Sequence, residues 1–63
     1  MTLKQIAKLF DNTIVIYIED EQNRNVDKIT VKNVAKSSFA DREVLHIKIL
    51  AIGMRVQVKG VKS

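Results

Sequence analysis

The strongest constraint on the fold is an alternation of apolar and polar residues that fills the last third of the chain and is interrupted at Gly53. Apolar side chains recur at every second position on both sides of this glycine: Leu45, Ile47, Ile49, Ala51, then Met54, Val56 and Val58. Because successive side chains of a strand point to opposite faces, this spacing predicts strands over 44–51 and 54–60. A two-residue turn at Ile52-Gly53 would place all of these apolar side chains on one face.

A short helix is predicted at the N-terminus. Thr2 and Gln5 have the Thr-x-x-Gln spacing of a capping box, in which each residue satisfies a free backbone N–H of the other. Apolar residues then recur at helical spacing as far as Phe10, which predicts a helix over 2–10 with one buried face.

Two further strands are predicted between this helix and the final hairpin. The β-branched segments 13–19 and 26–32 are strand-like, and the polar run between them is typical of a loop. Ser38 and Asp41 repeat the spacing that begins a helix, so we expect a single helical turn there, with Phe39 turned inward.

These elements predict an α+β fold in one domain, 1–63, because a chain this short has no room for a second core. The short N-terminal helix would pack on one face of a four-stranded, mainly antiparallel sheet. A small curled β-barrel with an N-terminal helix is the alternative, since apolar residues occur on both expected faces. The expected core residues are Leu3, Ile6, Phe10, Ile14, Ile16, Ile18, Ile29, Val31, Phe39, Leu45, Ile47, Ile49, Val56 and Val58.

The charge of the chain is unevenly distributed. Residues 1–43 are neutral overall, so the formal net charge of +4 lies in residues 44–63, whose cations are Lys48, Arg55, Lys59 and Lys62. Such an asymmetry suggests an anionic partner, although the same charge is also ordinary solubility charge for a small domain.

The sequence offers little for catalysis. It has one histidine, His46, no cysteine and two glycines, so it provides neither a nucleophile with its base nor a phosphate-cradling loop. The acidic run 20–25 lacks the glycine and glutamate of a calcium loop and is better explained as a turn. We therefore expect no enzymatic activity, cofactor, bound metal or small-molecule substrate. No apolar leader or membrane-length segment is evident, which favours a cytoplasmic protein that does not bind membranes.

The candidate functional surface is the expected outer face of the sheet. Apolar residues interrupt its polar pattern, and basic residues of the final hairpin surround them; the candidates are Val15, Tyr17, Val44, Leu50, Lys48, Arg55, Gln57 and Lys59. An apolar centre with a basic rim is typical of a protein-interaction surface. We expect a non-enzymatic interaction module that binds a protein partner or itself as a homodimer. The alternative is a nucleic-acid-binding module, in which the cations would contact phosphates and Tyr17 would stack on a base.

The order of these segments also carries a resemblance. The N-terminal Leu3-x-x-Ile-x-x-Leu-Phe pattern, the strand from Thr13 through Asp20 and the Asp41-Arg42-Glu43-Val44 entry to the hairpin resemble small phage and prophage proteins of AT-rich Gram-positive bacteria. This resemblance implies binding to a host macromolecule and assigns no binding residue. The helix followed by an Ile-Tyr strand is more distantly similar to Sm-like RNA-binding barrels, whose strand-bend glycines are missing here.

Overall fold

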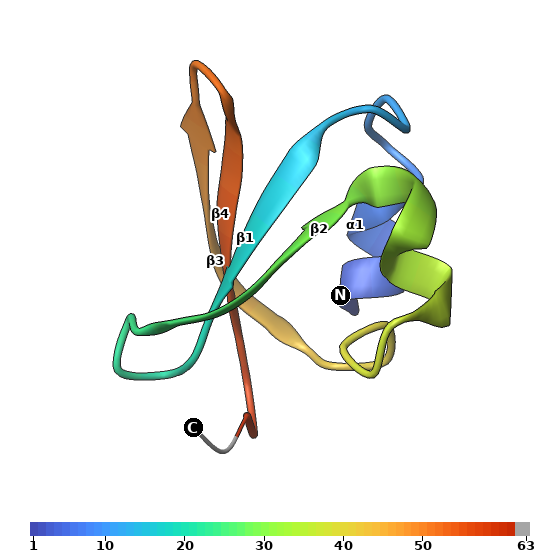
Figure 1. Cartoon of the computed structure of the whole chain (residues 1–63). Helices are drawn as coiled ribbons and strands as arrows, with labels where there is room; N and C mark the ends of the chain where they lie inside the picture. Colours follow the sequence, from blue (N-terminus) through green and yellow to red (C-terminus); the bar gives the residue numbers. More distant parts are fainter. Residues whose placement is uncertain (62–63) are drawn as a thin grey trace.

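The computed structural model describes residues 1–61, so Lys62 lies outside the described residues. The elements along the chain are α1 (Leu3–Ala7), β1 (Val15–Glu19), β2 (Asn25–Thr30), the 3-10 helix η1 (Val31–Lys36), β3 (Val44–Leu50) and β4 (Gly53–Val58) (Figure 1). The predicted α+β class is confirmed: a short N-terminal helix accompanies a four-stranded sheet.

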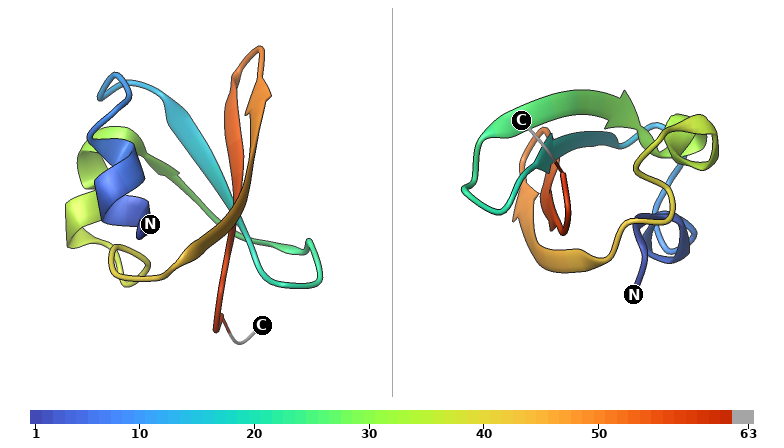
Figure 2. Two further views of the ribbon diagram at one scale, coloured as in Figure 1. Left: turned by 180° about the vertical axis from the view of Figure 1, so that it is seen from behind. Right: turned by 90° about the horizontal axis from the view of Figure 1, so that it is seen from below.

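The sheet is mixed rather than purely antiparallel. Its strand order is β2-β1-β4-β3, in which β1 and β4 pair in parallel at the centre while β2 and β3 pair antiparallel on either side. The sheet is strongly curled, and α1 and η1 lie together on its concave side (Figure 2). Because β2 and β3 remain as two edges, the sheet does not close into the barrel that the sequence left as an alternative.

The N-terminal cap forms as predicted, but the helix is shorter. The Gln5 side chain accepts a hydrogen bond from the Thr2 N–H at 2.9 Å, and the Thr2 hydroxyl accepts one from the Gln5 N–H at 3.3 Å. The α-helix ends at Ala7 instead of continuing to residue 10, and Phe10 still packs against the core from the turn that follows.

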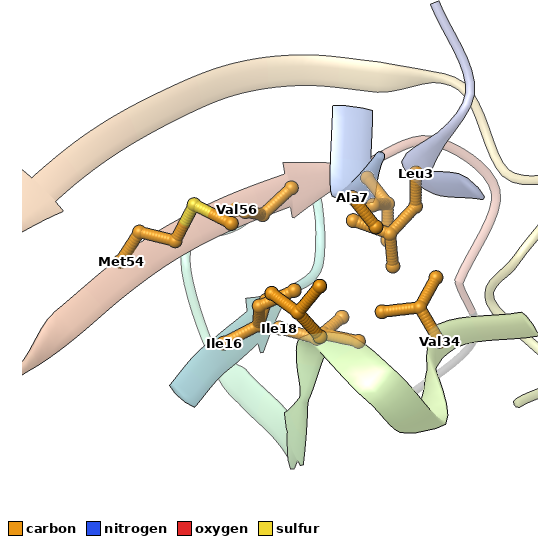
Figure 3. Close-up of a cluster of buried hydrophobic side chains, with 9 residues drawn as sticks. Leu3, Ala7, Ile16, Ile18, Val34, Met54 and Val56 are labelled. Carbon is orange, nitrogen blue, oxygen red and sulfur yellow. The ribbon is translucent and has the colours of Figure 1, made fainter. Parts of the chain in front are cut away.

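The core lies between the two central strands and the two helical segments (Figure 3). Ile16 and Ile18 of β1 lie directly opposite Met54 and Val56 of β4, and all four are at most 1% exposed. The remaining members of this core cluster are Leu3, Ala7, Val31, Val34 and Val58. Each fully buried aliphatic side chain contributes about 1.5–3 kcal/mol of transfer free energy, so this cluster dominates the stability of the fold.

Two residues predicted to be in the core are exposed. Leu45 is 47% exposed and Ile49 is 66% exposed, while Ile47 between them is partly buried. Ile47 and Ile49 pair with the buried Val56 and Met54, so they occupy the predicted concave face, whereas Leu45 falls in the register shift between Val44 and His46 and has no partner on β4. Ile49 is exposed because β3 is an edge strand, whose hairpin end extends beyond the two helical segments (Figure 1). Leu45 is exposed at the bulge, where the regular pairing of β3 with β4 is interrupted.

The hairpin register is shifted by two residues from the predicted one. The turn consists of Ala51 and Ile52, and Leu50 pairs with Gly53, the first residue of β4. Gly53 has a φ of 155° and lies so close to β1 that an added Cβ would overlap the Val15 main-chain oxygen. The glycine therefore serves the close approach of β4 to β1 rather than the turn itself.

Residues 38–41 form a hydrogen-bonded turn, in which the Arg42 N–H donates to the Phe39 oxygen at 3.0 Å, but the regular helical segment is the 3-10 helix before it, at Val31–Lys36, which was not predicted. The predicted strand 26–32 accordingly ends at Thr30. A 3-10 helix repeats every three residues, so Val31 and Val34 share one face, and both are buried beneath α1. Phe39 does turn inward, where it is partly buried against the core.

Candidate interaction surface

The face of the sheet away from α1 and η1 is covered by neither of them (Figures 1 and 2). We call this the outer face. The strand registers place on it Val15, Tyr17 and Glu19 of β1, Lys28 and Thr30 of β2, His46, Lys48 and Leu50 of β3, and Arg55 and Gln57 of β4. Period-two alternation thus gathers most of the sequence-predicted candidates onto one surface.

The apolar part of the outer face is centred on Tyr17. This ring, Val15 and Leu50 are each partly buried by their neighbours on the sheet. The Lys28 Nζ lies 5.8 Å from the centroid of the Tyr17 ring, close enough for a cation–π interaction. A shallow hollow of about 330 Å³ beside the ring is lined by Tyr17, Glu19, Asn25, Leu50, Ile52 and Arg55.

The charged part of the outer face is not uniformly basic. Lys48 and Arg55 lie directly opposite each other on β3 and β4, a placement that costs free energy when nothing neutralises it. The Glu19 carboxylate, with its Oε2 3.7 Å from the Arg55 Nε, offsets one of these two charges. A second hollow, of about 310 Å³, is lined by Glu19, Asn23, His46, Lys48, Arg55 and Gln57. The excess positive charge there suits a carboxylate or phosphate from outside the chain.

Gln57 has a structural task that the sequence did not indicate. Its Nε2 lies 3.3 Å from the Asp20 main-chain oxygen, 3.1 Å from that of Glu21 and 3.1 Å from Asn23 Oδ1. These contacts fasten the turn between β1 and β2 to the end of β4. Because its amide is committed within the chain, Gln57 supports the rim of the surface rather than offering a free donor.

The same turn is organised by Asp20, which is only 1% exposed. Its Oδ1 accepts hydrogen bonds from the main-chain N–H groups of Gln22 and Arg24, each at 2.9 Å, and its Oδ2 accepts from the Arg24 Nε at 3.1 Å. The hydrogen bond from the Arg24 N–H is the main reason that the pKa of the Asp20 carboxyl lies below its ordinary value of 3.8. The acidic run is thus a turn, as predicted, and its buried carboxylate, Asp20, accepts its hydrogen bonds from within the turn.

Two of the predicted site residues lie elsewhere. A bulge between Val44 and His46 turns the Val44 side chain to the concave side, where it packs against the core. Lys59 follows the end of β4, with its main-chain N–H donating to the Glu43 oxygen at 2.9 Å, and its side chain is exposed. Val44 therefore leaves the candidate surface, while Lys59 is peripheral to it.

Glu19 lies beside Lys48 and Arg55 on the outer face but was not among the site residues predicted from the sequence. It stands two residues after Tyr17 in the same strand, so the alternation that selected Val15 and Tyr17 also indicates it. Its meeting with Arg55 depends on the parallel pairing of β1 with β4, which the sequence did not predict.

Among residues 1–61, no helix combines the length and the apolar character that crossing a membrane requires. Comparisons of the chain with protein-family models, with curated proteins and with solved structures found no match.

Proposed function

We propose that this chain is a small non-enzymatic protein-interaction module that acts in the cytoplasm and also associates with itself. The observation that carries the proposal is the outer face: a partly buried Tyr17 flanked by Val15 and Leu50, with Lys48 and Arg55 beside them and neither α1 nor η1 above. Apolar centres with an aromatic anchor and an arginine are the composition that protein interfaces favour.

The chemistry of this surface indicates the chemistry of the surface that a partner would present to it. A protein that presents an apolar side chain to Tyr17 and carboxylates to Lys48 and Arg55 would neutralise the two cations that β3 and β4 hold opposite each other. Under this proposal, the phage-type order of the segments in the sequence is consistent with a macromolecule of the host cell as that partner.

Copurification of the tagged full chain from its own cell, with and without nuclease, tests the proposal. We expect a protein to copurify at comparable yield in both arms, and to be lost when Tyr17→Ala replaces the wild type. Recovery that depends on intact nucleic acid would contradict it.

A nucleic-acid-binding module is the second candidate, and the cluster of Lys28, Lys48 and Arg55 around Tyr17 favours it. Three phosphate contacts would give single-stranded binding a log–log salt slope of about −2, at about −0.7 for each contact. A fluorescent oligonucleotide titrated at several salt concentrations measures this slope. Non-specific dissociation constants are about 1–100 µM at physiological salt and become tighter as the salt concentration falls, so absence of binding at low salt and roughly 50 µM protein would remove this candidate.

A further inference from the structure

The two hollows of the outer face meet at the ion pair between Glu19 and Arg55. Both residues line the hollow beside the Tyr17 ring, and both also line the hollow beside Lys48. The first hollow extends toward the hairpin turn, where Leu50 lines it. A molecule that contacts the ion pair can therefore reach into both hollows.

The end of the first hollow nearest the hairpin turn is apolar. It is lined there by Leu50 and Ile52, with the Tyr17 ring beside them. Ile52 is 72% exposed, so much of this apolar surface is in contact with water. Because removal of apolar surface from water drives association, this end of the hollow suits an aliphatic side chain.

The charge around the ion pair indicates the second group that the surface takes. Lys48 is exposed, lies directly opposite Arg55, and pairs with no carboxylate among residues 1–61. Glu19 offsets one of these two cations, so one positive charge remains in excess when His46 is counted as neutral. A single carboxylate balances that excess. A nucleic-acid backbone carries a charge at every phosphate and would set further negative charges against Glu19.

The register of β3 gives the distance between the two groups. Leu50 and Lys48 lie on the same face of this strand, two residues apart, which is about 7 Å. A second extended chain has the same repeat, so its side chains at positions i and i+2 share one face and are also about 7 Å apart. An aliphatic residue and an acidic residue separated by one residue therefore match this spacing.

We infer that the outer face binds a short extended segment of the partner protein in which an aliphatic residue and a glutamate or aspartate are separated by one residue; the inference rests on the proposed interaction function and specifies its ligand. The aliphatic side chain contacts Tyr17 and Leu50. The carboxylate lies between Lys48 and Arg55, where it relieves the repulsion of two opposed cations. Glu19 competes with this carboxylate for Arg55 and so limits the affinity of the surface.

A symmetric peptide probes this spacing in either direction of binding. The probe is a blocked peptide with the sequence Glu-Ala-Leu-Ala-Glu, in which each glutamate is separated from the leucine by one residue. A contact of this size implies a dissociation constant on the order of 1 mM, which NMR titration of the isotope-labelled full chain measures. We expect saturable shifts at the amides of Tyr17, Lys48, Leu50 and Arg55.

Three comparison peptides separate charge, apolar contact and spacing on the wild-type chain. Gln-Ala-Leu-Ala-Gln lacks the carboxylates, and Glu-Ala-Gly-Ala-Glu lacks the aliphatic side chain. Ala-Glu-Leu-Glu-Ala keeps the composition and net charge of the probe but directs its glutamates away from the face of the leucine. Each should bind at least about five-fold more weakly than the probe.

Substitutions in the chain test the role assigned to each charge. Lys48→Gln and Arg55→Gln should weaken binding of the probe at least about five-fold, and Lys36→Gln, an exposed residue at the end of η1, is the matched control that should leave it unchanged. Glu19→Gln should strengthen binding at least about three-fold, because it removes the competing carboxylate. Glu43→Gln, which removes an exposed carboxylate before β3, is the control for that gain.

The peptide comparisons need no variant to fold, so they decide the inference alone. No saturable shift up to about 10 mM probe overturns it, as does equal binding of the two peptides of identical composition. Binding that Glu19→Gln does not strengthen overturns the assigned competition for Arg55. If the peptides fail while Tyr17→Ala still abolishes partner capture, the inference is wrong and the proposed function stands. Capture that requires intact nucleic acid contradicts the proposed function itself, so the two failures are distinguishable.

Discussion

Arg55 and Glu19 meet on the outer face of the sheet, with the Arg55 Nε 3.7 Å from the Glu19 Oε2. The two residues come from neighbouring parallel strands, β4 and β1, that are separated in the chain by β2, η1 and β3. The pair joins the apolar centre around Tyr17 to the cations of the final hairpin. Because the Arg55 side chain is half exposed, this pair contributes little to stability, and Arg55 stays accessible for the proposed interaction.

Replacing Arg55 by alanine tests whether this residue contributes little to stability. The Arg55 side chain is 51% exposed, and exposed ion pairs contribute about 0–1 kcal/mol. We expect Arg55→Ala to change the free energy of unfolding by about 0.5 kcal/mol or less, as measured by urea denaturation. A loss of several times this amount would mean that the ion pair holds β1 to β4.

The close approach of Gly53 to Val15 predicts a large effect from a single methyl group. Gly53→Ala would drive a Cβ into the Val15 oxygen at a positive φ, and should lower the free energy of unfolding by about 2–4 kcal/mol. Gly60→Ala is the matched control: its φ is 79°, but the atom it would meet is the end of the flexible Arg42 side chain. That change should cost about 1 kcal/mol. Equal losses in the two variants would contradict this account of Gly53.

The contrast between β1 and the edge strand β3 predicts opposite sensitivities for two isoleucines. Ile18 is 0% exposed and Ile49 is 66% exposed. Ile18→Ala should cost about 2–5 kcal/mol, as truncations in a close-packed core do, and Ile49→Ala about 0.5 kcal/mol or less in the monomer. Denaturation midpoints at low protein concentration measure both. A large loss at Ile49 would place that side chain back in the core.

The turn around Asp20 predicts a specific response to acid. Since folding lowers the pKa of Asp20 below 3.8, its carboxylate stabilises the fold above that pH. This contribution is lost as the pH falls from 3.8 toward the lower folded value. Asp20→Asn should reduce stability at pH 7 and flatten the decline of the urea midpoint below about pH 4. Parallel pH curves for the wild type and the variant would show that Asp20 is not responsible.

The fold class and the faces of the strands could be predicted because they depend on local periodicity. Period-two alternation assigns Ile47 and Lys48 to opposite faces in any register shifted by an even number of residues, so the two-residue error in the hairpin left both assignments intact. The capping box at Thr2 is equally local.

What could not be predicted depends on contacts between distant segments. The exposure of Ile49 follows from the position of β3 at the edge, and strand order is not encoded in alternation. The inward turn of Val44 follows from a bulge, and the helical segment at Val31–Lys36 from the burial of two valines against α1. The role of Gln57 required knowledge that the β1–β2 turn lies beside the end of β4.

The measurement that tests the central claim most directly compares partner capture by outer-face variants with capture by a control variant on the opposite side of the molecule. Tyr17→Ala and Arg55→Glu change the anchor and a rim cation, whereas Lys8→Glu changes an exposed residue that follows α1. With nuclease present and each variant shown to be folded, the first two should reduce the captured protein at least about ten-fold, as loss of an interface anchor does, and Lys8→Glu should leave it unchanged. Equal capture by all three variants would contradict the assignment of the outer face as the interaction surface.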